Sequence, residues 1–400
     1  MRLLLFTGKG GVGKSTVAAA TAVHAARCGA RTLLLSLEPG QALSDVIGAP
    51  ADAWPALEPG LSVRQVDPGG AGRWPDLIGH LLGIAAEVDV DPAVAEDVTA
   101  FPGAQDVLTL LAIRELARSG ERDLLVIDGP ATAEMLRLLS LPEAVGRWVR
   151  RMLPVDQRIR RALAIGTRTP VRSDGEPRPQ DHLAAVADRL QAGLVEARAV
   201  LTAPPASIRL VLTPESAVLA HARRAWSALA LHGYLVDGVV VNRVLPDGAT
   251  GTWLADRARG QAAVLDQIEA SFPGLSVLRA ALFAAEPCGV EALAGLGAGL
   301  YGHPTARAGA ALVAEPRMRP PMQVQRDGEQ FLFQLELPRV SRQEVDLSRH
   351  GDDLLVGVGR QSRAVTLPSV LRRCRVVDAS LRDGRLQIRF EPDPALWRSS

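Results

Sequence analysis

The sequence Gly8-Lys9-Gly10-Gly11-Val12-Gly13-Lys14-Ser15 fits the pattern G-x-x-x-x-G-K-S at every fixed position. The apolar run 3–7 precedes it, and the alanine-rich stretch 15–28, which has helical spacing, follows it. A buried strand, a glycine loop and a helix in this order form a polyphosphate-binding loop, because backbone N–H groups and the helix N-terminus then face the phosphates. This stretch therefore predicts an α/β fold that binds a nucleotide.

Each position of this loop has an expected role toward ATP. Lys14 should reach the β and γ phosphates, Ser15 should bind Mg²⁺, and Thr16 can contact the α phosphate. The sequence therefore predicts ATP and Mg²⁺ as cofactors. The other predicted nucleotide-binding residues of the loop are Gly8, Lys9, Gly10, Gly11, Val12 and Gly13.

Lysine occurs only at Lys9 and Lys14, and every other cationic side chain is Arg. Because Lys is a compact point charge and Arg a bulky fork, we expect both positions to require a small ammonium group. A lysine at the second loop position resembles the deviant Walker A loop of the partition, division-site and nitrogenase-iron-protein ATPases. In those families it crosses a dimer interface to the partner's phosphates, where it supplies charge as an arginine finger does. A solvated loop lysine is the alternative reading.

Beyond the loop, strands and helices alternate. Strands are predicted at 32–37, 61–66, 123–127, 208–212 and 236–241, with helices such as 104–118 and 216–231 between them. This order predicts a doubly wound parallel sheet with helices on both faces and ligands at the carboxyl ends of the strands. The stretch 142–205 interrupts this alternation of strands and helices and is expected to be a helical insertion.

The composition changes to Pro, Ala and Arg over 303–321, which indicates a linker. Strands at 330–337, 354–358, 364–367 and 386–390 predict a small all-β sandwich after it. The expected domains are therefore 1–302, the linker 303–321, and 322–400.

Composition excludes some classes of function. The 45 Lys and Arg balance 44 Asp and Glu, so no strong field attracts nucleic acid or anionic lipid. No apolar run reaches the ~18 residues that a transmembrane helix needs. Three widely spaced cysteines make a disulfide framework improbable and favour a cytoplasmic location.

Several later blocks resemble the ArsA arsenite-pump ATPases and their relatives that target tail-anchored membrane proteins. The switch I block is LLSLEPGQALSD at 34–45, and the switch II block is DGPATAEMLRLL at 128–139. The shorter blocks are TPES at 213–216, VVVNR at 239–243 and EPCG at 286–289. The resemblance covers 1–302 and implies an ATPase.

The resemblance also implies residue roles. Asp128 matches the switch II aspartate that holds Mg²⁺ through water, and Asn242 matches the asparagine that reads adenine; a turn-capping Asp and an ordinary turn Asn are the alternatives. Glu38 stands where the family has the aspartate that positions the attacking water. It is one methylene longer, so slow hydrolysis is expected. The catalytic set is thus Lys9, Lys14, Glu38 and Asp128, and the metal set is Ser15 and Asp128.

The client is harder to predict. Arsenite needs clustered thiols, and the cysteines have no such spacing. An apolar stripe of Val145, Trp148, Val149 and Met152, with a second at Ile159 and Leu163, could form a groove for an apolar protein segment. An ordinary amphipathic helix is an equal alternative, and an anionic membrane surface a weaker one.

The C-terminal domain resembles the small-heat-shock-protein (α-crystallin) fold, either as an accessory domain or as a purely structural appendage. The segments that show this resemblance are VDLS at 345–348, the strand 354–358, LP at 367–368 and ASLRDGRL at 379–386. Together these expectations describe a Mg·ATP-dependent, homodimeric ATPase that captures and releases or transports a client, without nucleic acid. A nucleotide-gated holdase with little hydrolysis is the alternative.

Overall fold

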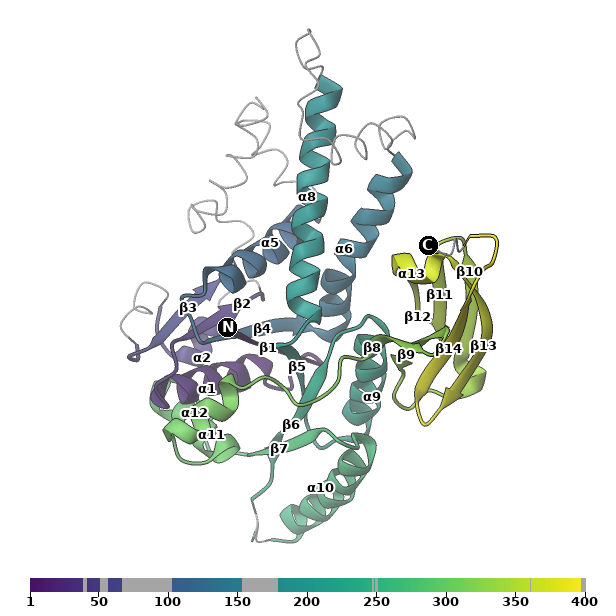
Figure 1. Cartoon of the computed structure of the whole chain (residues 1–400). Helices are drawn as coiled ribbons and strands as arrows, with labels where there is room; N and C mark the ends of the chain where they lie inside the picture. Colours follow the sequence, from purple (N-terminus) through teal and green to yellow (C-terminus); the bar gives the residue numbers. More distant parts are fainter. Residues whose placement is uncertain are drawn as a thin grey trace. The chain divides into compact units, whose positions relative to one another are not determined.

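The computed structural model describes residues 1–38, 42–50, 57–66, 103–152, 179–246, 248, 251–359 and 361–396 (Figure 1). The chain divides into two compact units. The first contains Met1–Gln65, Glu121–Leu136 and Leu201–Ser400, and the second contains Val66–Gly120 and Arg137–Val200. The predicted site residues all belong to the first unit.

The first unit contains a sheet of seven strands in the order β3-β2-β4-β1-β5-β6-β7, and all the pairs are parallel. The strands are β1 (Arg2–Gly8), β2 (Thr32–Ser36), β3 (Leu61–Gln65), β4 (Leu124–Ala131), β5 (Ala206–Leu212), β6 (Val236–Val244) and β7 (Ser276–Ala281). β1 and β2 are buried along their whole length, as expected of strands covered on both faces. The strand order reverses beside β1, which is where open α/β sheets bind ligands.

Helices cover both faces of this sheet. α1 (Lys14–Arg27) packs on β1, β2 and β4, and α9 (Ser216–Leu231) packs on β5 and β6. Because the chain moves in opposite directions along the sheet after β1 and after β5, right-handed crossovers place these two helices on opposite faces. Other helices described in this part are α2 (Ala42–Ile47), α10 (Thr252–Ser271), α11 (Val290–Tyr301) and α12 (Ala306–Val313).

The segment expected as a linker, 303–321, is partly helical. α12 packs against α1, and a Cβ on Gly309 would lie 2.6 Å from the Cβ of Cys28. Thr305 caps α12, since its side chain accepts a hydrogen bond from the Ala308 N–H. The Pro and Arg content of the segment concealed the short run ARAGAALV, which has good helix formers.

The second unit is described for three helices. They are α5 (Ala104–Ser119), the part of α6 (Thr132–Met152) after Leu136, and α8 (Pro179–Thr202). Ion pairs join them: Arg137 to Asp106, and Arg198 to Glu143. Within the expected insertion at 142–205, the described residues up to Thr202 are helical, and α5 belongs to the same unit.

The C-terminal part folds into two antiparallel sheets, in the orders β10-β11-β12 and β13-β14-β9-β8. Their strands are β8 (Met322–Asp327), β9 (Gln330–Glu336), β10 (Val345–His350), β11 (Asp353–Val358), β12 (Gln361–Thr366), β13 (Cys374–Arg382) and β14 (Arg385–Pro392). Alternate residues of β9, β11 and β14 are buried, as a sandwich requires. β8, β10 and β13 were not predicted, because mostly polar and exposed side chains hide their alternation.

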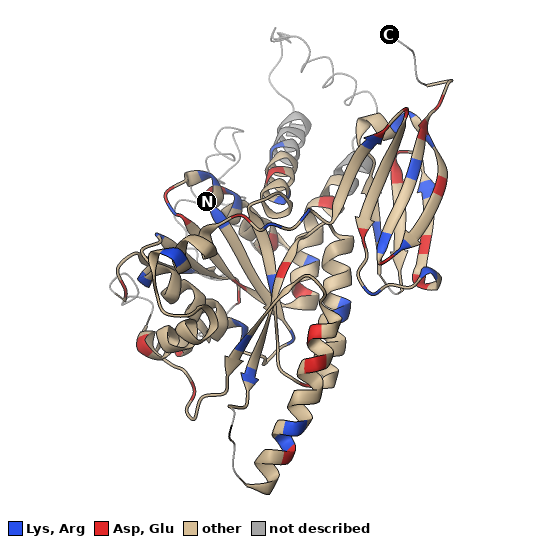
Figure 2. Cartoon of the chain, turned by 60° about the horizontal axis from the view of Figure 1, so that its bottom comes forward, with Lys and Arg blue, Asp and Glu red and all other residues tan. Residues whose placement is uncertain are grey.

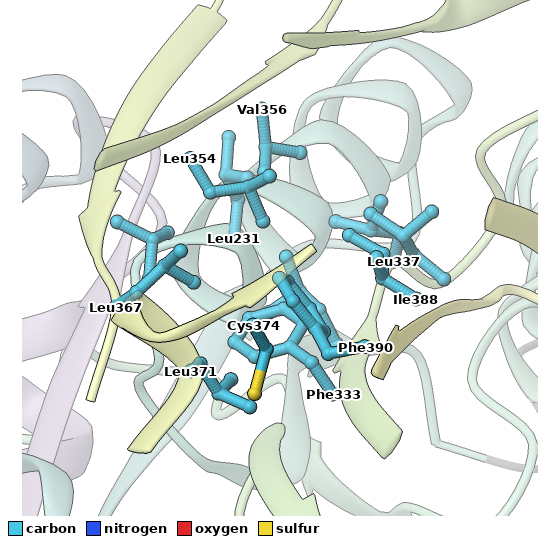
Figure 3. Close-up of a cluster of buried hydrophobic side chains, with 13 residues drawn as sticks. Leu231, Phe333, Leu337, Leu354, Val356, Leu367, Leu371, Cys374, Ile388 and Phe390 are labelled. Atoms are coloured by element: carbon cyan, nitrogen blue, oxygen red, sulfur yellow. The ribbon is translucent and has the colours of Figure 1, made fainter. Parts of the chain in front are cut away.

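One side chain of the sheet domain belongs to the core of this sandwich. Leu231, the last residue of α9, is fully buried in the same cluster as Phe333, Leu354 and Val356 (Figure 3). The buried Arg363 of β12 donates a hydrogen bond to the Leu231 carbonyl, which is one of the unpaired carbonyls at a helix end. The Ser227 hydroxyl donates to the Pro338 carbonyl at 2.6 Å. The sandwich is therefore anchored on the end of α9.

Acidic and basic side chains are interspersed along the helices and strands (Figure 2). This agrees with the balanced composition. Within the described ranges, no helix combines the length and the apolar character that crossing a bilayer requires.

Candidate nucleotide-binding site

The phosphate loop starts at the end of β1, where Gly8 pairs with Val211 of β5. A Cβ on Gly8 would lie 2.1 Å from the Val211 carbonyl oxygen, so only glycine fits this strand end. The loop ends at Gly13, which has φ +89°, and α1 begins at Lys14. The helix N-terminus and the loop N–H groups thus point to the carboxyl edge of the sheet, as the sequence predicts for phosphate binding.

Lys14 and Glu38 form an ion pair. Lys14 Nζ lies 3.0 Å from Glu38 Oε1, and the lysine side chain is only 7% exposed. The Glu38 N–H donates to Ser36 Oγ at 3.3 Å, and the Glu38 carbonyl accepts from Gln65 Nε2 at 3.2 Å. These bonds place the carboxylate on the ammonium that is predicted to hold the β and γ phosphates. Phosphates bound to Lys14 as predicted would therefore compete with Glu38 for the same charge.

Asp128 lies on β4 beside this pair and is fully buried. Its Oδ2 accepts a hydrogen bond from Ser36 Oγ at 3.1 Å, and Ser15 also bonds to its side chain. Burial raises the pKa of Asp128 to about 6, and the charge of Glu38 acts in the same direction, while the bond from Ser15 opposes it. Among the described residues, Oδ1 has no hydrogen-bond partner.

This arrangement fits a hydrated Mg²⁺. The ion prefers oxygen ligands, keeps several waters, and binds through one or two protein groups. Ser15 offers a hydroxyl, and Asp128 offers a buried carboxylate oxygen that lacks a partner within the described part of the chain. A divalent cation here would also favour the charged form of Asp128.

Asn242, on β6, meets the phosphate loop directly. Its Nδ2 donates to the Val12 carbonyl at 2.9 Å, and its Oδ1 accepts from the Arg243 N–H at 2.9 Å. A Cβ on Gly13 would lie 2.3 Å from Asn242 Nδ2, so the glycine makes this approach possible. The structure therefore brings the predicted base-reading residue to the predicted phosphate loop.

Asn242 faces a cavity of about 340 Å³, within the ~300–1,000 Å³ typical of small-molecule sites. Residues from the phosphate loop, β6, the end of β7 and α11 form its walls. They are Gly13, Thr16, Asn242, Arg243, Ala281, Leu282, Phe283, Ala284, Ala285, Glu286, Pro287 and Leu296. We call this cavity the base pocket. The sequence did not predict the wall at 281–285, because β7 has only the short pattern SVLRAA with a charged residue inside it.

Lys9 lines a second, smaller cavity with Thr132, the first residue of α6, and His221 of α9. This cavity has no room for a water molecule. Within the described residues, Thr132 Oγ1 and His221 Nε2 are buried without a hydrogen-bond partner. Burial, then Arg224, then Lys9 lower the pKa of His221.

Some sequence predictions lie outside the described residues. Ile159 and Leu163 of the expected client groove are among them. The side chains of Trp148, Val149 and Met152 are also outside the description.

Comparison with known proteins identifies the family of this chain. Residues 1–302 match the family of anion-transporting ATPases called ArsA ATPases. The chain belongs to the ArsA ATPase family. It is an ATPase, and its C-terminal residues 328–390 match the HSP20-like domain found in ArsA proteins.

Three relatives align with this ArsA-family chain over nearly the whole of both sequences. An uncharacterized protein of Streptomyces coelicolor is 36% identical, with 99% of each chain covered. A protein of Chlorobaculum tepidum, named as an arsenical pump-driving ATPase, is 32% identical over 98% of this chain and 96% of its own. A protein of Aquifex aeolicus, named as arsenical pump-driving ATPase 1, is 26% identical over 93% of this chain and 95% of its own.

Proposed function

We propose that this chain hydrolyses ATP as its Mg²⁺ complex in a cytoplasmic homodimer, and that the cycle captures and releases an apolar protein segment. One observation carries the nucleotide part of the proposal. The phosphate loop, the Asp128 oxygen without a partner in the described residues, and the base pocket behind Asn242 meet at one edge of the sheet.

The residues of the site would act in sequence. The phosphates of ATP take over Lys14, and Glu38 is thereby released from its ion pair. Its carboxylate can then accept a hydrogen bond from the attacking water and orient this water for attack. Ser15, and Asp128 through water, would hold Mg²⁺, which would supply positive charge to the phosphate oxygens.

In this proposal Lys9 supplies further positive charge to the transition state. Its side chain is exposed, and no ion pair of Lys9 occurs among the described residues. It would cross to the nucleotide of a second copy and stabilise the negative charge of the transition state. Each protomer then depends on its partner for turnover, so a homodimer is the active form.

A protein client fits the chain better than arsenite. Trivalent arsenic needs several thiols together. The three cysteines are free but separate: Cys28 follows α1, the Cys288 thiol donates to the Asp45 carbonyl, and Cys374 is buried in the β sandwich. The described residues contain no group of three or more His, Cys, Asp or Glu side chains placed to hold a metal ion.

A nucleotide-gated holdase with little hydrolysis is the second candidate. The observation that favours it is the Lys14–Glu38 ion pair, because a side chain one methylene longer than aspartate reaches the lysine and must be displaced in each cycle. Glu38→Asp separates the two candidates. A large gain in turnover supports a protein tuned toward switching, whereas a loss supports Glu38 as the native water-positioning group.

The test of the whole proposal uses turnover and capture. Lys14→Ala should lose nucleotide binding or hydrolysis, and Lys9→Ala should bind ATP but lose turnover. A monomer of Lys9→Ala with full activity would refute the dimer mechanism.

Affinity purification with a non-hydrolysable ATP analogue and with ADP should enrich proteins with one apolar terminal helix in only one nucleotide state. Capture of unfolded proteins in both states would favour the holdase.

A further inference from the structure

The strand that carries Asn242 has a β-bulge at the base pocket. Val241 pairs with Arg279 and Val244 pairs with Ala281, so β6 holds one more residue than β7 between these pairs. Arg243, inside the bulge, has φ 60°, a left-handed conformation that is unfavourable for a residue with a side chain. Such a conformation persists only when surrounding contacts fix it.

Gln261 of α10 supplies those contacts. Its Oε1 accepts a hydrogen bond from the Leu245 N–H at 2.9 Å, and its Nε2 donates to the Arg243 carbonyl at 3.2 Å. The side chain is only 9% exposed, so water competes little for these bonds. One amide thus holds the backbone at the bulged residue and two positions after it.

The bulge in turn fixes the orientation of the Asn242 amide. Oδ1 accepts from the Arg243 N–H, and Nδ2 donates to the Val12 carbonyl. Rotation of the amide by 180° would bring its oxygen against the Val12 carbonyl and its NH₂ against the Arg243 N–H. Asn242 therefore keeps one lone pair on Oδ1 and one hydrogen on Nδ2, in a fixed orientation, for a ligand.

A fixed amide of this kind discriminates between purines. Adenine offers an N6 donor beside the N7 acceptor, which matches one lone pair and one hydrogen of an asparagine. Guanine offers two acceptors, O6 and N7, at the same edge, so the Oδ1 lone pair would face an oxygen. Discrimination then depends on the amide not rotating, and hence on the conformation of Arg243.

We infer that Gln261 is the positioning residue of the base pocket: by holding the bulge at Arg243 it fixes the Asn242 amide and makes the site select adenine over guanine nucleotides. The inference rests on the proposed function, since it requires ATP in the base pocket. Gln261 itself does not line that pocket, so it acts through Asn242 and Arg243.

A merely structural role for Gln261 predicts something different. If its bonds only attached α10 to the sheet, their loss would lower the melting temperature and reduce the binding of all nucleotides alike. Positioning instead predicts a change in the ratio of the ATP and GTP affinities, and a higher KM for ATP with little change in kcat.

The experiment compares Gln261→Leu, Gln261→Glu and the wild type of the full-length protein. Titration calorimetry with ATP and with GTP gives the affinity ratio, and steady-state kinetics gives KM and kcat. Gln261→Leu loses both bonds, and the ATP affinity should fall about tenfold while the GTP affinity stays within about twofold. Gln261→Glu keeps an acceptor for the Leu245 N–H and cannot donate to Arg243, so its ratio should be intermediate.

Gln267→Leu is the matched control, because Gln267 is exposed on the same helix. It should keep the wild-type ratio. If Gln261→Leu is too unstable to purify, Gln261→Glu decides. A wild type that selects ATP, with Gln261 variants that keep its ratio, would overturn the inference and leave the ATPase intact. A wild type that binds neither nucleotide would refute the proposed function and the inference with it.

Discussion

Replacement of Leu231 by alanine should destabilise the β sandwich, although Leu231 belongs to helix α9 and not to the sandwich strands. Leu231 is fully buried in the cluster that contains Phe333, Leu354 and Val356. Truncation removes the transfer free energy of the side chain and leaves a cavity, and such Leu→Ala changes cost ~2.7–5.0 kcal/mol in a well-packed core. We expect about 4 kcal/mol, toward the upper part of this range, because the Leu231 carbonyl keeps its bond to Arg363 and limits collapse around the gap.

Native-state hydrogen exchange is the assay, because it reports the free energy of opening for each strand separately. In Leu231→Ala the amides of β9, β11 and β14 should lose protection, while those of β1 and β4 keep most of theirs. Leu229→Ala is the matched control: Leu229 is equally buried on α9 but is not part of the sandwich cluster. In Leu229→Ala the amides of β1 and β4 should lose protection, while those of β9, β11 and β14 keep most of theirs. A cost below about 1 kcal/mol for Leu231→Ala, or the same pattern in both variants, would refute the anchoring of the sandwich on α9.

Three further predictions concern charge. Glu38→Gln should raise ATP affinity about fivefold in calorimetry by freeing the loop lysine, and should abolish turnover. Arg31 hydrogen-bonds Asp123 and lowers the pKa of that carboxyl to about 2. Asp123→Asn should therefore cost about 1 kcal/mol in urea unfolding at pH 7, after allowance for solvent screening, and the difference should vanish as pH falls from 3.8 through 2. Lys9→Ala should raise the pKa of His221 in an NMR titration, because a positive charge is removed.

Each of these has a contrary outcome. An unchanged ATP affinity in Glu38→Gln would show that the ion pair does not compete with phosphate; Glu134→Gln, at an exposed position, is its control. A cost of Asp123→Asn that stays constant down to pH 2 would mean that the carboxylate charge contributes nothing. A pKa of His221 that is unchanged in Lys9→Ala would place the ammonium away from the imidazole.

The local parts of the fold were predictable and the tertiary contacts were not. Gly8 and Gly13 are specified by the spacing of the phosphate loop, and the apolar run before them predicts a buried strand without any other information. The contact of Asn242 with that loop joins residues far apart in the chain. Only the resemblance to a family pointed to Asn242, and the pairing of its amide with Val12 required the structure.

The same division holds for the sandwich and for Glu38. β13 was missed since its exposed face carries Arg375 and Asp378 and its alternation is weak. The pairing of Glu38 with Lys14 also could not be foreseen, because sequence spacing does not report how far a flexible carboxylate reaches. Leu231 looked like one more apolar residue of a helix, and nothing in its neighbours indicates that it belongs to a different domain's core.

The anchoring of the sandwich on α9 has a consequence for how the chain is made. Ribosomes release the chain from its N-terminus, and domains generally fold in that order. Leu231 is synthesised before Met322, where the first strand of the sandwich begins. The β strands therefore emerge beside a helix end that can already be in place, and the folded ATPase domain serves as the surface on which the β sandwich completes its core.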